Sequence, residues 1–225
     1  AGRTPSAGDL RAGLRELLQT RAALAVSAKR ESPAAQRNRE PIADVLADVL
    51  PERGIVLEMA SGTGEHVVHF AKRFAHLDWY PSDPDAGARA SIAAHVAQAG
   101  LANVMPPLAL DAAASEWPLD AADAIVCINM VHISPWQATE GLFAGAARLL
   151  PPMDGPLILY GPYLEREVET APSNLAFDES LKARDPRWGL RDLADVDALA
   201  KRHGFTRTLR VAMPANNLIV VYRKA

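Results

Sequence analysis

The sequence predicts an α/β fold: a seven-stranded, mostly parallel sheet with an antiparallel edge strand and helices on both faces. Short apolar runs of strand length alternate with helical segments along most of the chain. The run 124–128 is apolar throughout, which is typical of a strand covered on both faces. The run 55–57 leads into a glycine-containing turn and then a helical segment, 65–74. Strand, glycine turn and helix in that order favour a nucleotide-binding arrangement.

Before the first strand we expect an N-terminal extension, residues 1–29, that is partly helical. Apolar residues at near-helical spacing predict a helix over Leu10–Ala28. The polar stretch Lys29–Arg39 is interpreted as a loop. Pro41 then begins a second helix at the first helical position, where proline is favoured. The main domain is expected to cover residues 30–225.

The remaining elements follow from apolar period and turn residues. Residues 161–192 are interpreted as an insertion, and the last two strands as an antiparallel hairpin at the sheet edge. Strands are expected at 55–57, 78–81, 104–110, 124–128, 157–160, 206–212 and 218–222, and helices at 65–74, 86–99, 136–150, 177–184 and 193–203.

Composition excludes several classes of function. A net charge of −3 and a pI near 6.1 argue against a broad nucleic-acid surface. No apolar stretch approaches the length of a membrane span. Arginines interrupt the N-terminal segment where a signal peptide would be apolar, and the single Cys127 fits a reducing compartment. We therefore expect a cytoplasmic protein without a nucleic-acid or membrane partner.

Four acidic or amide residues lie at the ends of predicted strands. Because the carboxyl ends of parallel strands meet at one edge of an open sheet, these side chains should project toward one crevice. The glycines of the first turn let the backbone approach a ligand closely at a helix N-terminus. The strand-end residues are Glu58, Asp83, Asp111 and Asn129, and the glycines are Gly62 and Gly64.

The turn favours S-adenosylmethionine over a dinucleotide. A dinucleotide site needs a third small residue three positions after the second glycine, and Val67 stands there. Asp83 lies 19 residues beyond Gly64 and suits the ribose of either cofactor. Asp111 is placed for an adenine amino group. A nicotinamide-dependent oxidoreductase remains the less favoured alternative.

Several longer strings resemble the DUF938 family, also called UPF0585, whose members are methyltransferase-like proteins. The resemblance covers about residues 30–224. The matching strings lie at 37–42, 57–66, 79–85, 129–136, 160–163, 172–178 and 213–218.

The resemblance implies a class I methyltransferase that binds S-adenosylmethionine and releases S-adenosylhomocysteine. By analogy the glycine turn would hold the methionine end, Asp83 the ribose and Asp111 the adenine. Asn129 and Met130 would contact the amino-acid part through the backbone. The implied cofactor residues are Glu58, Ala60, Ser61, Gly62, Gly64, Asp83, Asp111, Asn129 and Met130.

His132 is our candidate general base, because histidine titrates near neutral pH and this one closely follows the fourth strand. Its alternative role is to cap the next helix or bond a backbone carbonyl. Tyr160, assigned with it to the catalytic group, and Tyr163 flank Gly161 and are candidates to line an acceptor pocket. Their alternative is an aromatic edge of the core.

Arginines before the second helix are candidates to clamp a carboxylate, and amides complete the predicted substrate site. His66 and His69 are three residues apart on one predicted helix, but no third ligand lies near in sequence. We therefore interpret both as structural surface histidines and predict no metal site. The substrate-site residues, besides Tyr163, are Arg37, Asn38, Arg39 and Asn174.

The resulting hypothesis is S-adenosylmethionine-dependent methyl transfer to a small-molecule acceptor, with oxygen, nitrogen and sulfur all open as the methylated atom. A general base is required only if the acceptor proton has a high pKa. The alternative is a non-catalytic protein that binds the same cofactor and acts through a partner. A homodimer is left open.

Overall fold

The computed structural model describes residues 28–153 and 155–224 as one α/β unit. The helix expected over 10–28, and nearly all of the extension 1–29, lies outside these residues. The helices are α2 (Pro33–Val49), α3 (Glu65–Arg73), α4 (Ala86–Ala99), α5 (Trp136–Leu149), α6 (Pro172–Arg184) and α7 (Leu193–Arg202), with a 3-10 turn η1 (Pro214–Asn216). The strands are β1 (Gly54–Met59), β2 (Leu77–Pro81), β3 (Ala124–Ile128), β4 (Pro156–Gly161), β5 (Phe205–Met213) and β6 (Asn217–Lys224).

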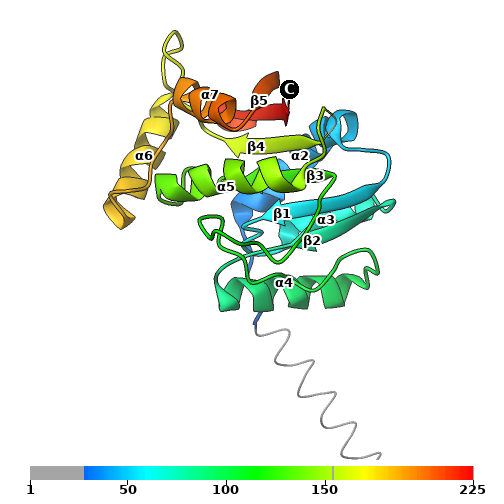
Figure 1. Ribbon diagram of the computed structural model, residues 1–225. Coiled ribbons are helices and arrows are strands. Elements are labelled where there is room, and N and C mark those ends of the chain that lie inside the picture. The colour runs from blue at the N-terminus through cyan, green and yellow to red at the C-terminus, as the bar shows by residue number, and fades with distance from the viewer. Residues whose placement is uncertain (1–27, 154, 225) are drawn as a thin grey trace, which may run out of the picture.

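The six strands form one sheet in the order β2-β1-β3-β4-β6-β5 (Figure 1). The first four run parallel to one another, and β6 is antiparallel to both β4 and β5. The predicted hairpin at the sheet edge is therefore confirmed. With β1 and β3 adjacent, the chain reverses direction across the sheet between them, so their carboxyl ends flank the crevice expected for ligands.

The expected third of seven strands, residues 104–110, is the one strand prediction that is wrong. This segment runs beside β2 and makes only isolated bridges, Trp79 with Val104 and Ser82 with Leu108. Pro106 and Pro107 lie between the two bridges and have no N–H to donate to a ladder. The sheet therefore has six strands, with an extended segment in the place of the seventh.

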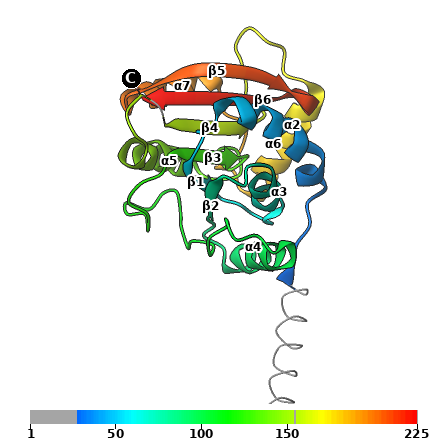
Figure 2. The same cartoon turned by 90° about the vertical axis from the view of Figure 1, so that its right-hand side faces the viewer.

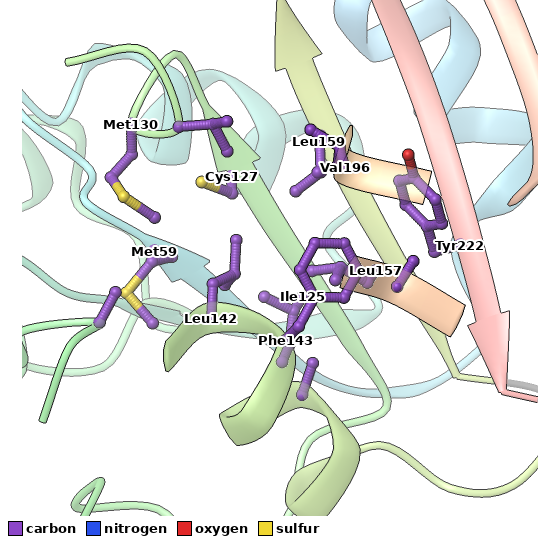
Figure 3. Close-up of a cluster of buried hydrophobic side chains, with 14 of the residues drawn as sticks. Met59, Ile125, Cys127, Met130, Leu142, Phe143, Leu157, Leu159, Val196 and Tyr222 are labelled. Atoms are coloured by element: carbon purple, nitrogen blue, oxygen red, sulfur yellow. The ribbon is translucent and has the colours of Figure 1, made fainter. Parts of the chain in front are cut away.

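Side chains of the central strands alternate between two buried clusters, one on each face of the sheet. On one face, α5 and α7 cover residues such as Ile125, Leu157 and Tyr222 (Figure 3). On the other face, α2 and α3 cover Val126, Ile158 and their neighbours. Figure 2 shows these two helix layers on opposite sides of the sheet. This arrangement explains why the central strands are apolar throughout.

Two helices begin earlier than predicted. The side chain of Ser32 accepts the N–H of Ala35 and caps α2, with Pro33 in its first turn. Pro41 therefore lies inside the helix, and residues 33–39 are helical rather than a loop. The buried face of α2 around Ile42 compensates for the hydrogen bond that Pro41 cannot donate. Helix α6 starts five residues before the expected 177, again at a proline, Pro172.

In the part of the chain that the structure describes, no helix is both long and apolar enough to cross a membrane.

Candidate functional site

The turn between β1 and α3 depends on left-handed backbone at three positions. Ala60, Gly62 and Gly64 have φ angles of 54°, 58° and 91°. A Cβ on Gly64 would lie 2.7 Å from the Cα of Ile92 on α4, so this glycine is required by both conformation and close packing. Gly62 has open space around it and requires glycine only for its conformation.

Asp83, just after β2, holds this turn in place. Its Oδ2 accepts the N–H of Gly62 at 3.0 Å, and its Oδ1 accepts the N–H of Asp85 at 2.9 Å. The neighbouring Ser82 accepts the N–H of Ser61 at its carbonyl, over 2.7 Å. The carboxyl ends of β1 and β2 are thus joined by hydrogen bonds, with a buried aspartate between them.

A cavity of about 410 Å³ opens at these strand ends. Its size falls within the range of small-ligand sites. Eight of the nine predicted cofactor residues line it: Glu58, Ala60, Ser61, Gly62, Asp83, Asp111, Asn129 and Met130. Gly64 lies behind the turn, where it packs on α4. The structure therefore gathers the strand-end residues at one cavity, as the topology requires.

Asp111, Asn129 and Met130 line the same cavity but differ in exposure and in backbone conformation. Asp111 is exposed, and its Oδ1 accepts the N–H of Ala113 at 2.9 Å. Asn129 adopts a left-handed conformation with φ 62°, while its N–H bonds the carbonyl of Tyr160 at 2.8 Å. Met130 is buried at the cavity wall. The turn after β3 is thereby fixed against β4.

Glu58 is the most perturbed carboxyl at the cavity. It is 1% exposed, and its Oε2 has no hydrogen-bond partner among the described residues. Burial raises its pKa from 4.5 to about 8; a hydrogen bond with Ser61 acts against this shift, and the negative charge of Asp83 adds to it. A cation that enters the cavity would favour the charged carboxylate and lower the raised pKa of Glu58.

His132, the predicted base, lies behind the cavity wall and is not among its lining residues. Its ring is fully buried, edge-on to Tyr163 at 4.7 Å between centroids, and packed on Gly161. Neither ring nitrogen has a hydrogen-bond partner in the described chain. Burial, aided by the charge of Arg191, lowers its pKa to about 3. Its role as a base stays a prediction, and these surroundings fit a neutral core histidine.

The other predicted acceptor-side residues divide into two groups. Asn38 lies on α2, and its Oδ1 lies 2.8 Å from Nε2 of His66. Tyr160 is buried near the end of β4, where burial raises its pKa and Asn38 acts against this shift. Arg39 is half-buried close to His66, whereas Arg37 is exposed.

Tyr163 and Asn174 line a second, smaller cavity of about 180 Å³ beside η1 and the insertion. Asn174 donates to the carbonyl of Asn216 at 2.9 Å, which ties α6 to the final hairpin. The hydroxyl of Tyr163 is buried, without a hydrogen-bond partner among the described residues. These two residues therefore do not line the cavity at the strand ends.

The main cavity also has lining residues that were not predicted. His66, interpreted from sequence as a structural surface residue, lies in its wall. Its position directly after the glycine turn is the signal that could have identified it. Among described residues, no group of three or more candidate metal ligands is found. The further lining residues include Ser32, Ala35, Ile133, Ser134 and Ala138.

Helix α2 is fixed at the cavity by a buried glutamate of α3. Glu65 accepts the N–H of Ser32 at 2.5 Å and the side-chain amide of Gln36 at 3.1 Å. The start of α2 therefore forms one wall of the site. No spacing pattern in residues 32–66 predicts this contact, because it depends on how the two helices pack.

The sheet order, the reversed β6 and the cavity after β1 together define a Rossmann-like fold of the class I methyltransferase type. The mitomycin 7-O-methyltransferase MmcR has a TM-score of 0.73 at 17% identity, covering 85% of this chain and 54% of that one. A putative O-methyltransferase from Nostoc punctiforme PCC 73102 has a TM-score of 0.73 at 18% identity, covering 84% of this chain and 56% of that one. CalO1, a methyltransferase in calicheamicin biosynthesis in its SAH-bound form, has a TM-score of 0.65 at 19% identity, covering 80% of this chain and 52% of that one.

These likenesses show a shared fold, and the chain spans a little over half the length of the three solved structures. The sequence profile described as "Protein of unknown function (DUF938)" matches residues 29–224. The chain belongs to that family, as the sequence strings indicated.

Proposed function

We propose that this protein transfers a methyl group from S-adenosylmethionine to a small-molecule acceptor. The observation that carries the proposal is Glu58, a buried carboxyl with an unpartnered oxygen, in one cavity with Asp83 and the glycine turn. An uncompensated buried acid is costly unless a ligand supplies its partner. The ligand expected here is therefore cationic at one end.

The residues present fit S-adenosylmethionine. Glu58 would face its ammonium group, Asp83 would accept hydrogen bonds from the ribose hydroxyls, and Asp111 would meet the adenine amino group. The backbone at Asn129 and Met130 would contact the amino-acid part. The cofactor supplies a methyl group that is already activated by its positive sulfur. The protein then has to align the acceptor and exclude water.

Part of the cavity wall is apolar. Ala35 on α2, Ile133 in the turn after β3 and Ala138 on α5 are among its lining residues. Such a wall favours an acceptor with an apolar body and keeps competing water out. The solved structures named O-methyltransferases support a small-molecule acceptor for this chain, while the identity of the methylated atom is tested below.

The proposal is tested by calorimetric titration of the whole protein with S-adenosylmethionine, S-adenosylhomocysteine and NAD. We expect saturable binding of the two sulfur compounds and none of NAD, because Val67 is fully buried where a dinucleotide site needs a small residue. Binding of neither sulfur compound would refute the proposal. Binding of both, with no transfer to any acceptor and a stable partner protein recovered from extract, would favour a non-catalytic cofactor-binding protein.

A further inference from the structure

Three elements meet at a chain of polar side chains beside the cavity. His66, in the first turn of α3, lines the cavity, and its ring stacks on Phe70 at 5.6 Å. Its Nε2 lies 2.8 Å from Oδ1 of Asn38 on α2. Asn38 also lies near Tyr160 at the end of β4, where it opposes the rise in the pKa of Tyr160 that burial causes. The ring of His66 is therefore held from two sides.

This arrangement determines where the histidine proton lies. An amide oxygen only accepts hydrogen bonds, so Nε2 of His66 must donate to Oδ1 of Asn38. In the neutral ring the lone pair is then on Nδ1. Within the described chain, Nδ1 has no hydrogen-bond partner. It is the ring nitrogen left available to a ligand in the cavity.

The surroundings keep the ring neutral. Burial lowers the pKa of His66 to about 4, and the charges of His69 and Arg39 act in the same direction, while Glu65 opposes them. At neutral pH the ring therefore retains the lone pair. His132, by contrast, is fully enclosed away from the cavity lining.

We propose that His66 is the base that takes the proton of the methyl acceptor, and that Asn38 is the positioning residue that fixes its tautomer. The inference rests on the proposed function and names its acceptor class: an alcohol, phenol or thiol with an apolar body. The acceptor oxygen or sulfur forms a bond to the methyl carbon as the carbon–sulfur bond breaks. The electron pair of that bond stays on the cofactor sulfur, and the acceptor proton moves to Nδ1. The imidazolium then loses its proton to water.

The first test does not depend on turnover. The whole protein is labelled with ¹⁵N-histidine, and the His66 ring is assigned by its absence in His66→Gln. Nitrogen shifts of the wild type should show a single neutral tautomer protonated at Nε2. Asn38→Ala should show exchange between tautomers. A wild-type ring protonated at Nδ1, or a charged ring at pH 7, would overturn the inference even if a variant failed to fold.

The second test measures methyl transfer to 4-methylphenol, benzyl alcohol and benzyl mercaptan from S-adenosylmethionine. We expect kcat to fall roughly 10²-fold or more in His66→Gln, the usual scale for losing a general base, while the Kd of S-adenosylhomocysteine stays within about twofold. Asn38→Ala should lower kcat less than His66→Gln does.

His69→Gln is the matched control. It lies on the same helix, outside the cavity lining, with its ring 3.4 Å from the carboxylate of Glu40. Its kcat should stay within about twofold of the wild type, whereas that of His66→Gln falls roughly 10²-fold. A His66→Gln kcat close to wild type, or wild-type binding of S-adenosylhomocysteine without transfer to any of the three probes, would overturn this inference alone. Absence of that binding would refute the proposed function as well.

Discussion

Replacing Glu58 by glutamine tests the electrostatics of the cavity without changing its shape. In the wild type the pKa of Glu58 rises from 4.5 when unfolded to about 8 when folded. A raised pKa means that this group stabilises the fold at pH values below 4.5 and that the stabilisation is lost as pH rises through 8. Between pH 5 and pH 8 the loss is about 3.5 kcal/mol, from 1.36 kcal/mol per pKa unit.

The assay is urea unfolding of the wild type and Glu58→Gln at pH 5 and pH 8. The stability difference between the two proteins should change by about 3.5 kcal/mol across this interval, in favour of the variant at pH 8. Comparing the two proteins cancels the opposite contributions of the buried histidines. Glu140→Gln, an exposed glutamate on α5, is the control and should parallel the wild type. Parallel curves for Glu58→Gln and the wild type would refute the assignment of a raised pKa.

The same carboxyl should respond to the cofactor. Near pH 7 about 90% of Glu58 is protonated in the free protein, given a pKa near 8. A cationic ligand beside it favours the carboxylate, so binding of S-adenosylmethionine should release a proton. Calorimetry in two buffers of different ionisation enthalpy measures this release. Glu58→Gln should bind more weakly and release none.

Three further predictions concern the site and its support. Asp83→Ala should weaken S-adenosylhomocysteine binding by roughly 1–3 kcal/mol, because Asp83 holds Gly62 and faces the cavity; a calorimetric Kd within twofold of wild type would remove it from the site. Gly64→Ala should lower the free energy of unfolding by at least about 1 kcal/mol more than Gly62→Ala does. Both glycines have positive φ, but of the two only Gly64 lies close to neighbouring backbone, at Ile92. Equal losses of stability in urea unfolding would contradict this. The depressed pKa of His132 means that the ring stabilises the fold above pH 6.5 and that this stabilisation is lost on acidification toward pH 3. Between pH 7 and pH 5 the wild type should therefore lose about 2 kcal/mol more unfolding free energy than His132→Gln. Identical losses would contradict the burial of the ring.

The strand ends were predictable because they depend on local patterns. The apolar run 124–128 forms β3 with the expected bounds, and the turn after β1 has the backbone that its glycines suggested. Parallel strands place Glu58, Asp83 and Asn129 at one edge of the sheet whatever the details of packing. The strand-end wall of the cavity therefore follows from topology and needs few tertiary contacts.

The errors in the fold come from proline. Pro106 and Pro107 remove two donors from a segment whose apolar residues otherwise fit a strand. Pro41 fits the first position of a helix, but the cap at Ser32 lets the helix begin at Pro33, about two turns earlier. In both cases a local preference was outweighed by a neighbouring residue.

The cavity wall at α2 and α3 could not be predicted, because it depends on how the two helices pack against each other. Glu65 accepts the N–H of Ser32, and His66 bonds Asn38, so adjacent residues of α3 hold successive turns of α2. Neither contact has a sequence period, and the separations of 33 and 28 residues carry no pattern. The histidine that follows a strand, His132, was the natural candidate for a base, yet packing on Gly161 encloses it. His66, which follows the glycine turn, lies in the cavity wall with its ring oriented by Asn38, and we therefore place the base there.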